Sequence, residues 1–184
     1  MKKYKVILAD PPWQWKTWSE NGRTKTPDKH YTEMNLNKIK ELNVQKYAAD
    51  DCVLLLWTTY PHILDAFKVI DAWGFKFSTV AFTWIKTNKK SNGIFMGMGY
   101  WTRTNAEICM LAKQGHPHRQ AADVRQVIIS PRRGHSQKPD EQYERIERLL
   151  VGPYLELFAR YKYKQWDTWG NELKNDINLE KKKR

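Results

Sequence analysis

The segment YKVILADPPW, at residues 4–13, decides the fold of this chain. Its first six residues, apart from Lys5, are apolar, aromatic or β-branched, which is typical of a short buried strand. The strand is expected to end at Asp10, because the two prolines that follow cannot continue a central hydrogen-bond ladder. The strand therefore brings Asp10 to the edge of a sheet, followed there by Pro11, Pro12 and Trp13.

Apolar strands and amphipathic helices alternate along the rest of the chain. Strands are predicted at residues 52–58, 75–85, 105–112, 124–129 and 154–159, and helices at residues 36–48, 61–74 and 136–150. This alternation predicts an α/β fold with a doubly wound, mostly parallel sheet. Ligands of such sheets bind beyond the carboxyl ends of the strands, so the surroundings of Asp10 are the expected site.

Length, charge and composition narrow the class of protein. The 184 residues fit a single domain at residues 1–173, and residues 174–184 are expected to form a basic, frayed tail. The 32 Lys and Arg residues outnumber the 20 Asp and Glu residues, and the net charge of +12 favours a polyanionic partner. An aromatic content of 13% excludes collagen-like and disordered chains. No apolar run reaches membrane-spanning length, so we expect a cytoplasmic protein without a membrane partner.

Cysteine and histidine residues do not predict a metal site. Cys52 and Cys109 both lie in apolar runs, where a thiol behaves as a small buried hydrophobic group. His116 and His118 flank Pro117 without a nearby third ligand, so a solvated loop is favoured over a metal centre. We therefore predict no metal ion.

The residues at 10–13 suit a reaction at a nucleobase amine. Such an amine is a poor nucleophile because its lone pair is delocalised into the ring, so a catalyst should accept hydrogen bonds from both N–H groups. Asp10 can accept one and the Pro11 carbonyl the other, while Trp13 offers a ring for the base to stack on. The alternative is a turn that ends the strand, with Trp13 as a core residue.

Seven motifs carry a resemblance to a known family. They are DPPW at 10–13, HYTEM at 30–34, LWTT at 56–59, WIKTN at 84–88, SQKPDE at 136–141, LELFAR at 155–160 and WGNE at 169–172. In this order they resemble the adenine-N6 methyltransferase family, which includes the catalytic subunit that methylates adenosine in messenger RNA and many bacterial and phage DNA enzymes. The resemblance covers nearly the whole chain.

The resemblance implies a fold, a cofactor and a set of residues that bind it. The fold would be Rossmann-like, with the catalytic DPPW strand before the strand that binds the cofactor, S-adenosylmethionine. Asp10, Pro11 and Pro12 would hold the adenine amine, with Trp13 against the base. The residues that would bind the cofactor are Asp10, Lys138, Phe158, Arg160, Asn171 and Glu172. Without the resemblance, residues 136–141 are simply the start of a helix.

Contacts with the substrate are expected from loops beside this site. The residues expected to bind the substrate are Tyr31, Lys86, Asn88, Arg103, Asn105 and Glu107. The loops at residues 21–29 and 87–99 carry basic residues that suit phosphate contacts, which contribute affinity rather than sequence choice. The alternative for both loops is a solvated surface without a ligand.

The expected function is transfer of a methyl group from S-adenosylmethionine to the N6 amine of adenine in DNA, as in the bacterial and phage enzymes. DNA is favoured over RNA because the chain is short and basic and lacks accessory RNA-binding domains. An RNA adenine methyltransferase and a non-catalytic nucleic-acid-binding subunit are the alternatives. Asp10 favours an enzyme, since the family's degenerate subunits lose this acid. A homodimer or a partner subunit is left open.

Overall fold

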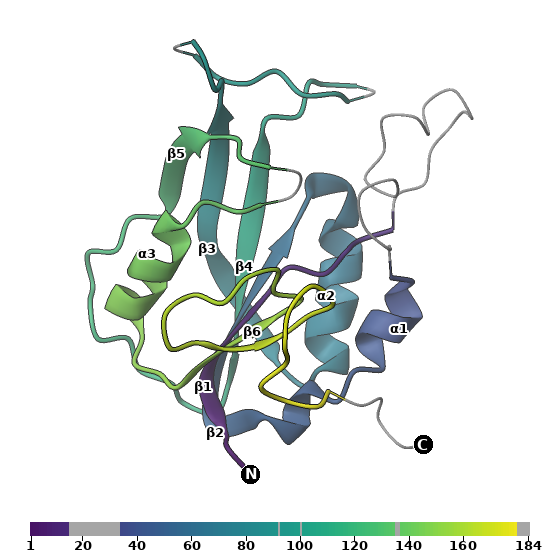
Figure 1. Ribbon diagram of the computed structural model, residues 1–184, viewed down its shortest axis with the longest axis vertical. Helices are drawn as coiled ribbons and strands as arrows, with labels where there is room; N and C mark the ends of the chain where they lie inside the picture. Colours follow the sequence, from purple (N-terminus) through teal and green to yellow (C-terminus); the bar gives the residue numbers. More distant parts are fainter. Residues whose placement is uncertain (15–33, 92, 100, 135–136, 180–184) are drawn as a thin grey trace.

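A single mixed sheet forms the centre of the computed structural model, which describes residues 1–14, 34–91, 93–99, 101–134 and 137–179 (Figure 1). Within these residues, seven strands lie in the order β5-β3-β4-β2-β1-β6-β7. The strands are β1 (Tyr4–Ala9), β2 (Ala48–Thr58), β3 (Lys76–Thr87), β4 (Ala106–Gln114), β5 (Val127–Pro131), β6 (Tyr154–Leu157) and β7 (Asp167–Trp169). The helices are α1 (Leu36–Lys40), α2 (Ile63–Ala72) and α3 (Glu141–Leu149), with 3₁₀ turns at Val44–Lys46 and Tyr60–His62.

Most neighbouring strands run parallel. The pairs β1–β2, β1–β6, β6–β7 and β3–β5 are parallel, whereas β4 runs antiparallel to both β2 and β3. The prediction of a mostly parallel α/β sheet is confirmed. The antiparallel course of β4 was not predicted, because the pattern of apolar residues in a strand does not encode its direction.

Helices cover both faces of the sheet, as Figure 1 shows for α1 and α2 on one side and α3 on the other. Side chains of a strand point to opposite faces in turn, and β1 follows this rule from Val6 onward, after an irregular pairing at Tyr4. Ile7 and Ala9 pack in the core below α1 and α2, whereas Val6 and Leu8 pack in the core below α3. A strand buried on both faces explains the continuous apolar run before Asp10.

The predicted helix at residues 36–48 is shorter in the structure. Asn35 caps α1 through its side chain, which accepts a hydrogen bond from the Asn37 backbone N–H at 2.9 Å, but the helix ends at Lys40. Residue 48 already belongs to β2, where Ala48 pairs with Tyr4. Pairing with the central strand thus outweighs the local helical pattern of this segment.

The C-terminal segment differs from the sequence prediction. The strand β7 was missed because it has only three residues. Residues 174–179 lie against the body of the protein instead of fraying. The Asp176 carboxylate accepts hydrogen bonds from the backbone N–H and the hydroxyl of Thr168, each at 3.0 Å, and Leu179 is buried. Residues 180–184 lie outside the described residues.

Two other sequence expectations concern cysteines and membranes. Cys52 and Cys109 are both buried, as predicted for thiols in apolar strands. Among the described residues, no helix is long and apolar enough to cross a membrane.

Candidate active site

A cavity of about 850 Å³ opens at the carboxyl ends of β1 and β6. These two strands are parallel neighbours, with Ala9 opposite Leu157, so the segments that follow them emerge side by side. In the sheet, β2 lies on one side of β1 and β6 on the other. The order of the strands therefore reverses at β1, and ligands of α/β sheets bind at such a topological switch point. The fold thus places Asp10 and Phe158 in one cavity wall, although they are far apart in sequence.

The DPPW segment is held by backbone hydrogen bonds. The Pro11 carbonyl accepts from the Trp13 N–H at 2.8 Å, and the Pro12 carbonyl accepts from the Met34 N–H at 3.0 Å. A carbonyl oxygen has two lone pairs, so Pro11 keeps one acceptor position. The segment therefore forms a tight turn and also offers the acceptor that was expected next to Asp10.

The Trp13 side chain is anchored in the protein. Its indole N–H donates to the Trp57 carbonyl at 3.1 Å, and its ring stacks on His62 with 5.8 Å between centroids. Only 6% of Trp13 is exposed, although it contributes to the cavity wall. The predicted core role of Trp13 is therefore present in the structure, and stacking against a base stays a prediction.

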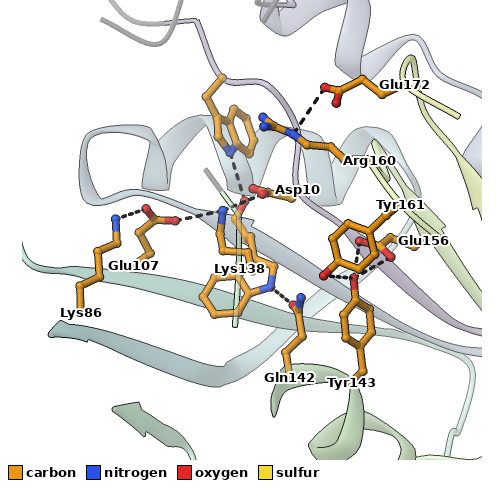
Figure 2. Close-up of polar contacts among 12 residues, drawn as sticks. Asp10, Lys86, Glu107, Lys138, Gln142, Tyr143, Glu156, Arg160, Tyr161 and Glu172 are labelled. Carbon is orange, nitrogen blue, oxygen red and sulfur yellow. Dashed lines mark hydrogen bonds and ion pairs between the residues drawn. The ribbon is translucent and has the colours of Figure 1, made fainter. Parts of the chain in front are cut away.

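Four charged side chains of alternating sign cross the floor of the cavity (Figure 2). The Lys138 ammonium lies 2.6 Å from Asp10 Oδ2 and 3.1 Å from Glu107 Oε2. The other oxygen of Glu107 accepts a hydrogen bond from Lys86. We call Asp10, Lys138, Glu107 and Lys86 the charge chain; its two carboxylates and two ammonium groups sum to zero.

Burial and neighbouring charges set the protonation of the charge chain. Burial raises the pKa of Asp10, against the pull of Lys138, and the Glu107 carboxylate raises it further. Burial also disfavours the charged form of Glu107, but Lys138 and Lys86 outweigh it and lower the pKa of Glu107. Burial alone would lower the pKa of Lys138, but Asp10 and Glu107 raise it well above its usual value. Lys138 is thus a permanent cation beside a carboxylate that binds protons more readily than usual.

The other side of the cavity follows β6. Phe158 has φ 63°, a left-handed conformation that bulky residues rarely adopt, and its ring contacts Trp169 edge-on at 5.4 Å between centroids. The strained turn at Phe158 redirects the chain at the end of β6. Arg160 follows, with its Nε 3.7 Å from Glu172 Oε1 (Figure 2). Phe158, Arg160, Asn171 and Glu172 all line the cavity.

The structure brings most predicted site residues together. Those that line the cavity are Asp10, Pro11, Pro12, Trp13, Lys86, Glu107, Lys138, Phe158, Arg160, Asn171 and Glu172. Asn88, Arg103 and Asn105 lie outside its wall, on the connection between β3 and β4. Tyr31 and the loop at residues 21–29 fall outside the described residues. His116 and His118 line a separate hollow beside the start of β1.

Sequence reasoning missed a half-buried carboxylate in the same cavity. Glu156 of β6 lies next to Leu8, and both of its oxygens accept hydrogen bonds from the Tyr143 hydroxyl, at 3.1 and 3.0 Å. The Tyr161 hydroxyl lies 3.5 Å from that of Tyr143 (Figure 2). The available signal was a glutamate inside the apolar LELFAR strand, where Leu155 and Leu157 are buried as expected.

Glu156 predicts a pH dependence of stability. Burial raises the pKa of Glu156 from 4.5 to about 8, although the hydrogen bonds from Tyr143 oppose the shift. Between these values the folded chain binds more protons than the unfolded chain, so the free energy of unfolding falls as the pH rises. Glu156→Gln is expected to remove this loss. Its gain in the free energy of unfolding over wild type should therefore be larger at the upper end of this pH range than at the lower end, by roughly 2–4 kcal/mol.

Urea unfolding at several pH values, on the wild type and on Glu156→Gln, checks this expectation. Glu144→Gln, at an exposed position of α3, is the matched control and should keep the wild-type pH dependence. A parallel pH dependence in wild type and Glu156→Gln would show that Glu156 ionises normally in the folded protein.

Comparison with known proteins identifies the family. A sequence model described as MT-A70 matches residues 4–172. The chain belongs to the MT-A70 family. Its mixed, mostly parallel sheet is accordingly that of a Rossmann-like methyltransferase, with the DPPW strand β1 before the LELFAR strand β6. The DPPW and LELFAR motifs, which carried the resemblance to this family, also contribute residues to the cavity wall.

Two kinds of relative match almost the full length of this MT-A70 chain. It is 32% identical to the type II methyltransferase M.MunI of a Mycoplasma species, over 94% of this chain and 78% of the relative. It is also 32% identical to the human N(6)-adenosine-methyltransferase catalytic subunit METTL3, over 93% of this chain and 28% of the relative. A similar match, at 30% identity, covers 24% of the N(6)-adenosine-methyltransferase MT-A70-like protein of Arabidopsis thaliana. The chain therefore spans about a quarter of these longer relatives.

Proposed function

We propose that this MT-A70 chain transfers a methyl group from S-adenosylmethionine to the N6 amine of adenine in DNA. The observation that carries the proposal is the placement of Asp10 and Pro11 in one cavity with the residues that follow β6. Two acceptors at one edge match the two N–H groups of an adenine amine.

The residues of the cavity fit the cofactor. S-adenosylmethionine carries a carboxylate, an ammonium group, a ribose diol and an adenine ring. Lys138 supplies a buried cation for the carboxylate. Asn171 and Glu172 offer polar groups for the ribose diol, as carboxylates do in dinucleotide-binding folds. The cavity volume of about 850 Å³ lies within the range of small-molecule sites.

The mechanism assigns a separate task to each group of the DPPW turn. When bound, S-adenosylmethionine supplies an electrophilic methyl group. Asp10 Oδ accepts a hydrogen bond from one amine N–H and the Pro11 carbonyl accepts one from the other, which directs the nitrogen lone pair out of the ring plane. As the new N–C bond forms and the S–C bond breaks, the amine must lose a proton. We assign this proton to Asp10, and the raised pKa that burial gives its carboxyl group supports the assignment.

DNA is the substrate we propose, on two grounds. The type II methyltransferase M.MunI matches this chain over 78% of its own length, against 28% for METTL3. The net charge of +12 suits a duplex phosphate backbone. RNA is the second candidate, because the N(6)-adenosine-methyltransferase METTL3 shares the same 32% identity with the chain.

The test is methyl transfer from labelled S-adenosylmethionine to matched double-stranded DNA, single-stranded DNA and RNA at low salt, with nucleoside analysis of the product. Label on N6 of adenine in DNA is expected. Label on RNA alone would transfer the proposal to the RNA enzyme. Tight, salt-sensitive binding without label on any substrate would identify a non-catalytic subunit instead.

A further inference from the structure

An apolar surface lies on the connection between β3 and β4. In the arm at residues 94–99, exposure alternates: Ile94, Met96 and Met98 are 58%, 72% and 64% exposed, whereas Phe95 between them is half-buried. Trp101 follows with 92% exposure. We call Ile94, Met96, Met98 and Trp101 the apolar ridge. Side chains of this size rarely face water together without a binding partner.

The ridge is held outward by the other arm of the same connection. The Gly97 N–H donates to the Thr104 carbonyl at 2.9 Å. A Cβ at Gly97 would lie 2.1 Å from that carbonyl oxygen, and a Cβ at Gly99 would lie 1.9 Å from the Thr102 carbonyl oxygen. The two glycines therefore lie where the described parts of the two arms meet, and Met98 between them is exposed on the other side.

Charge around the ridge favours a nucleic acid over a protein partner. From Lys86 to Asn105 the chain contains no Asp or Glu, and the cations Lys89, Lys90 and Arg103 add to Lys86, which is paired with Glu107. A polyanion is attracted to such a segment, and its affinity depends on salt. A ridge of apolar side chains within a cationic surface matches stacked bases within a phosphate backbone.

The connection that carries the ridge also borders the candidate active site. Lys89 and Phe95 line the cavity, and the Arg132 guanidinium, another lining group, lies 4.3 Å from the centre of the Phe95 ring. The backbone N–H of Phe95 donates to the Lys86 carbonyl at 2.8 Å, which ties the arm to the end of β3. The ridge therefore lies on the same connection as two residues of the cavity wall, although its own side chains are outside that wall.

We propose that the apolar ridge inserts between stacked bases of a duplex beside the target adenine and fills the space that the extruded base leaves. This inference rests on the proposed function. The N6 amine of adenine is paired inside a duplex, so the base must leave the stack to reach Asp10. Apolar side chains wedged between base steps offset the cost of unstacking. Trp101 supplies the largest ring for stacking on a neighbouring base.

The test compares two forms of one substrate. The duplex carries the site that the wild type methylates, either fully paired or with a mismatch opposite the target adenine, which is already partly unstacked. The variant Met96→Ala/Met98→Ala/Trp101→Ala is expected to lose at least about tenfold more activity on the paired than on the mismatched duplex. Leu64→Ala, at a 74% exposed position of α2, is the control and should keep the wild-type ratio.

A second measurement reads base extrusion without turnover. The duplex carries 2-aminopurine at the target position, and its fluorescence should rise when the wild type binds and rise less with the triple variant at saturation. The proposed wedge would be overturned if the triple variant lost the same activity on both duplexes, or if it raised the fluorescence as much as the wild type does. It would also be overturned by wild-type activity restricted to single strands, or by a change of oligomeric state in the variant, which would make the ridge a protein interface. An inactive wild type that still raises the fluorescence would refute the proposed function alone.

Discussion

Replacing Asp10 by alanine is expected to lower methyl transfer by about a thousandfold or more while cofactor affinity changes by less than about tenfold. Asp10 is the charged acceptor at the end of β1, and the remaining acceptor, the Pro11 carbonyl, already takes one hydrogen bond from Trp13. A single neutral acceptor cannot hold both amine protons, so the nitrogen lone pair stays delocalised. In this variant, Lys138 and the residues after β6 are still present to bind the cofactor, so its affinity should change little.

The structure also indicates that Asp10→Ala should fold. Burial disfavours the ionised form of Asp10, so little stability is lost with its charge. In the variant, Lys138 keeps a second carboxylate partner in Glu107 (Figure 2). Turnover with labelled S-adenosylmethionine and cofactor affinity by calorimetry are measured on the same preparation. Asp71→Asn, at an exposed position of α2, is the control for removing a carboxylate elsewhere. Substantial turnover by Asp10→Ala would exclude Asp10 as the acceptor of the amine proton.

Replacing Lys138 by methionine is expected to abolish activity and to lower the free energy of unfolding by about 3 kcal/mol. Lys138 is 7% exposed and contacts both Asp10 and Glu107, so its loss leaves two carboxylates close together without their shared cation. The cofactor carboxylate loses the same cation. Adding Glu107→Gln to the variant removes one of the two negative charges and should recover part of the stability, whereas activity stays lost.

The control for Lys138→Met is the same substitution at the surface. Lys68 of α2 pairs with Asp65 at 2.8 Å, but its side chain is 57% exposed. Exposed pairs of this kind contribute little, so Lys68→Met should change the free energy of unfolding by less than about 0.5 kcal/mol. Equal losses in the two variants would show that the charge chain is no more important for stability than a surface ion pair.

The stability loss of Lys138→Met should depend on pH in a defined direction. Without Lys138, burial raises the pKa of Asp10 with no contacting ammonium to oppose it, and only Lys86 is left beside Glu107 to lower its pKa. The folded variant then binds more protons than the unfolded variant, so its stability grows as the pH falls. The wild type behaves differently, because the pKa of Glu107 is lowered in its folded state. In urea unfolding, Lys138→Met should therefore lose less free energy of unfolding relative to wild type near pH 5 than near pH 7.5, because its carboxylates take up protons in this range.

Local sequence predicted those parts of the fold that depend on nearby residues. The apolar run before Asp10 and the proline pair after it predict a buried strand that ends at a sheet edge, and both features are present. The cap of α1 by Asn35 likewise involves only adjacent residues. The end of α1 was not, because it depends on the pairing of Ala48 with Tyr4 across the sheet.

The motifs determined the family and most of the cavity wall, since each motif carries its own chemistry in a few adjacent residues. Only the tertiary structure decided how these residues act on one another. Asp10, Lys86, Glu107 and Lys138 come from four separate segments, and the packing of the segment before α3 against β1, β3 and β4 makes them one chain of contacts. The raised pKa of Glu156 likewise arises from burial against α3. Distances between such segments and their exclusion from water depend on long-range packing, which no local pattern of residues encodes.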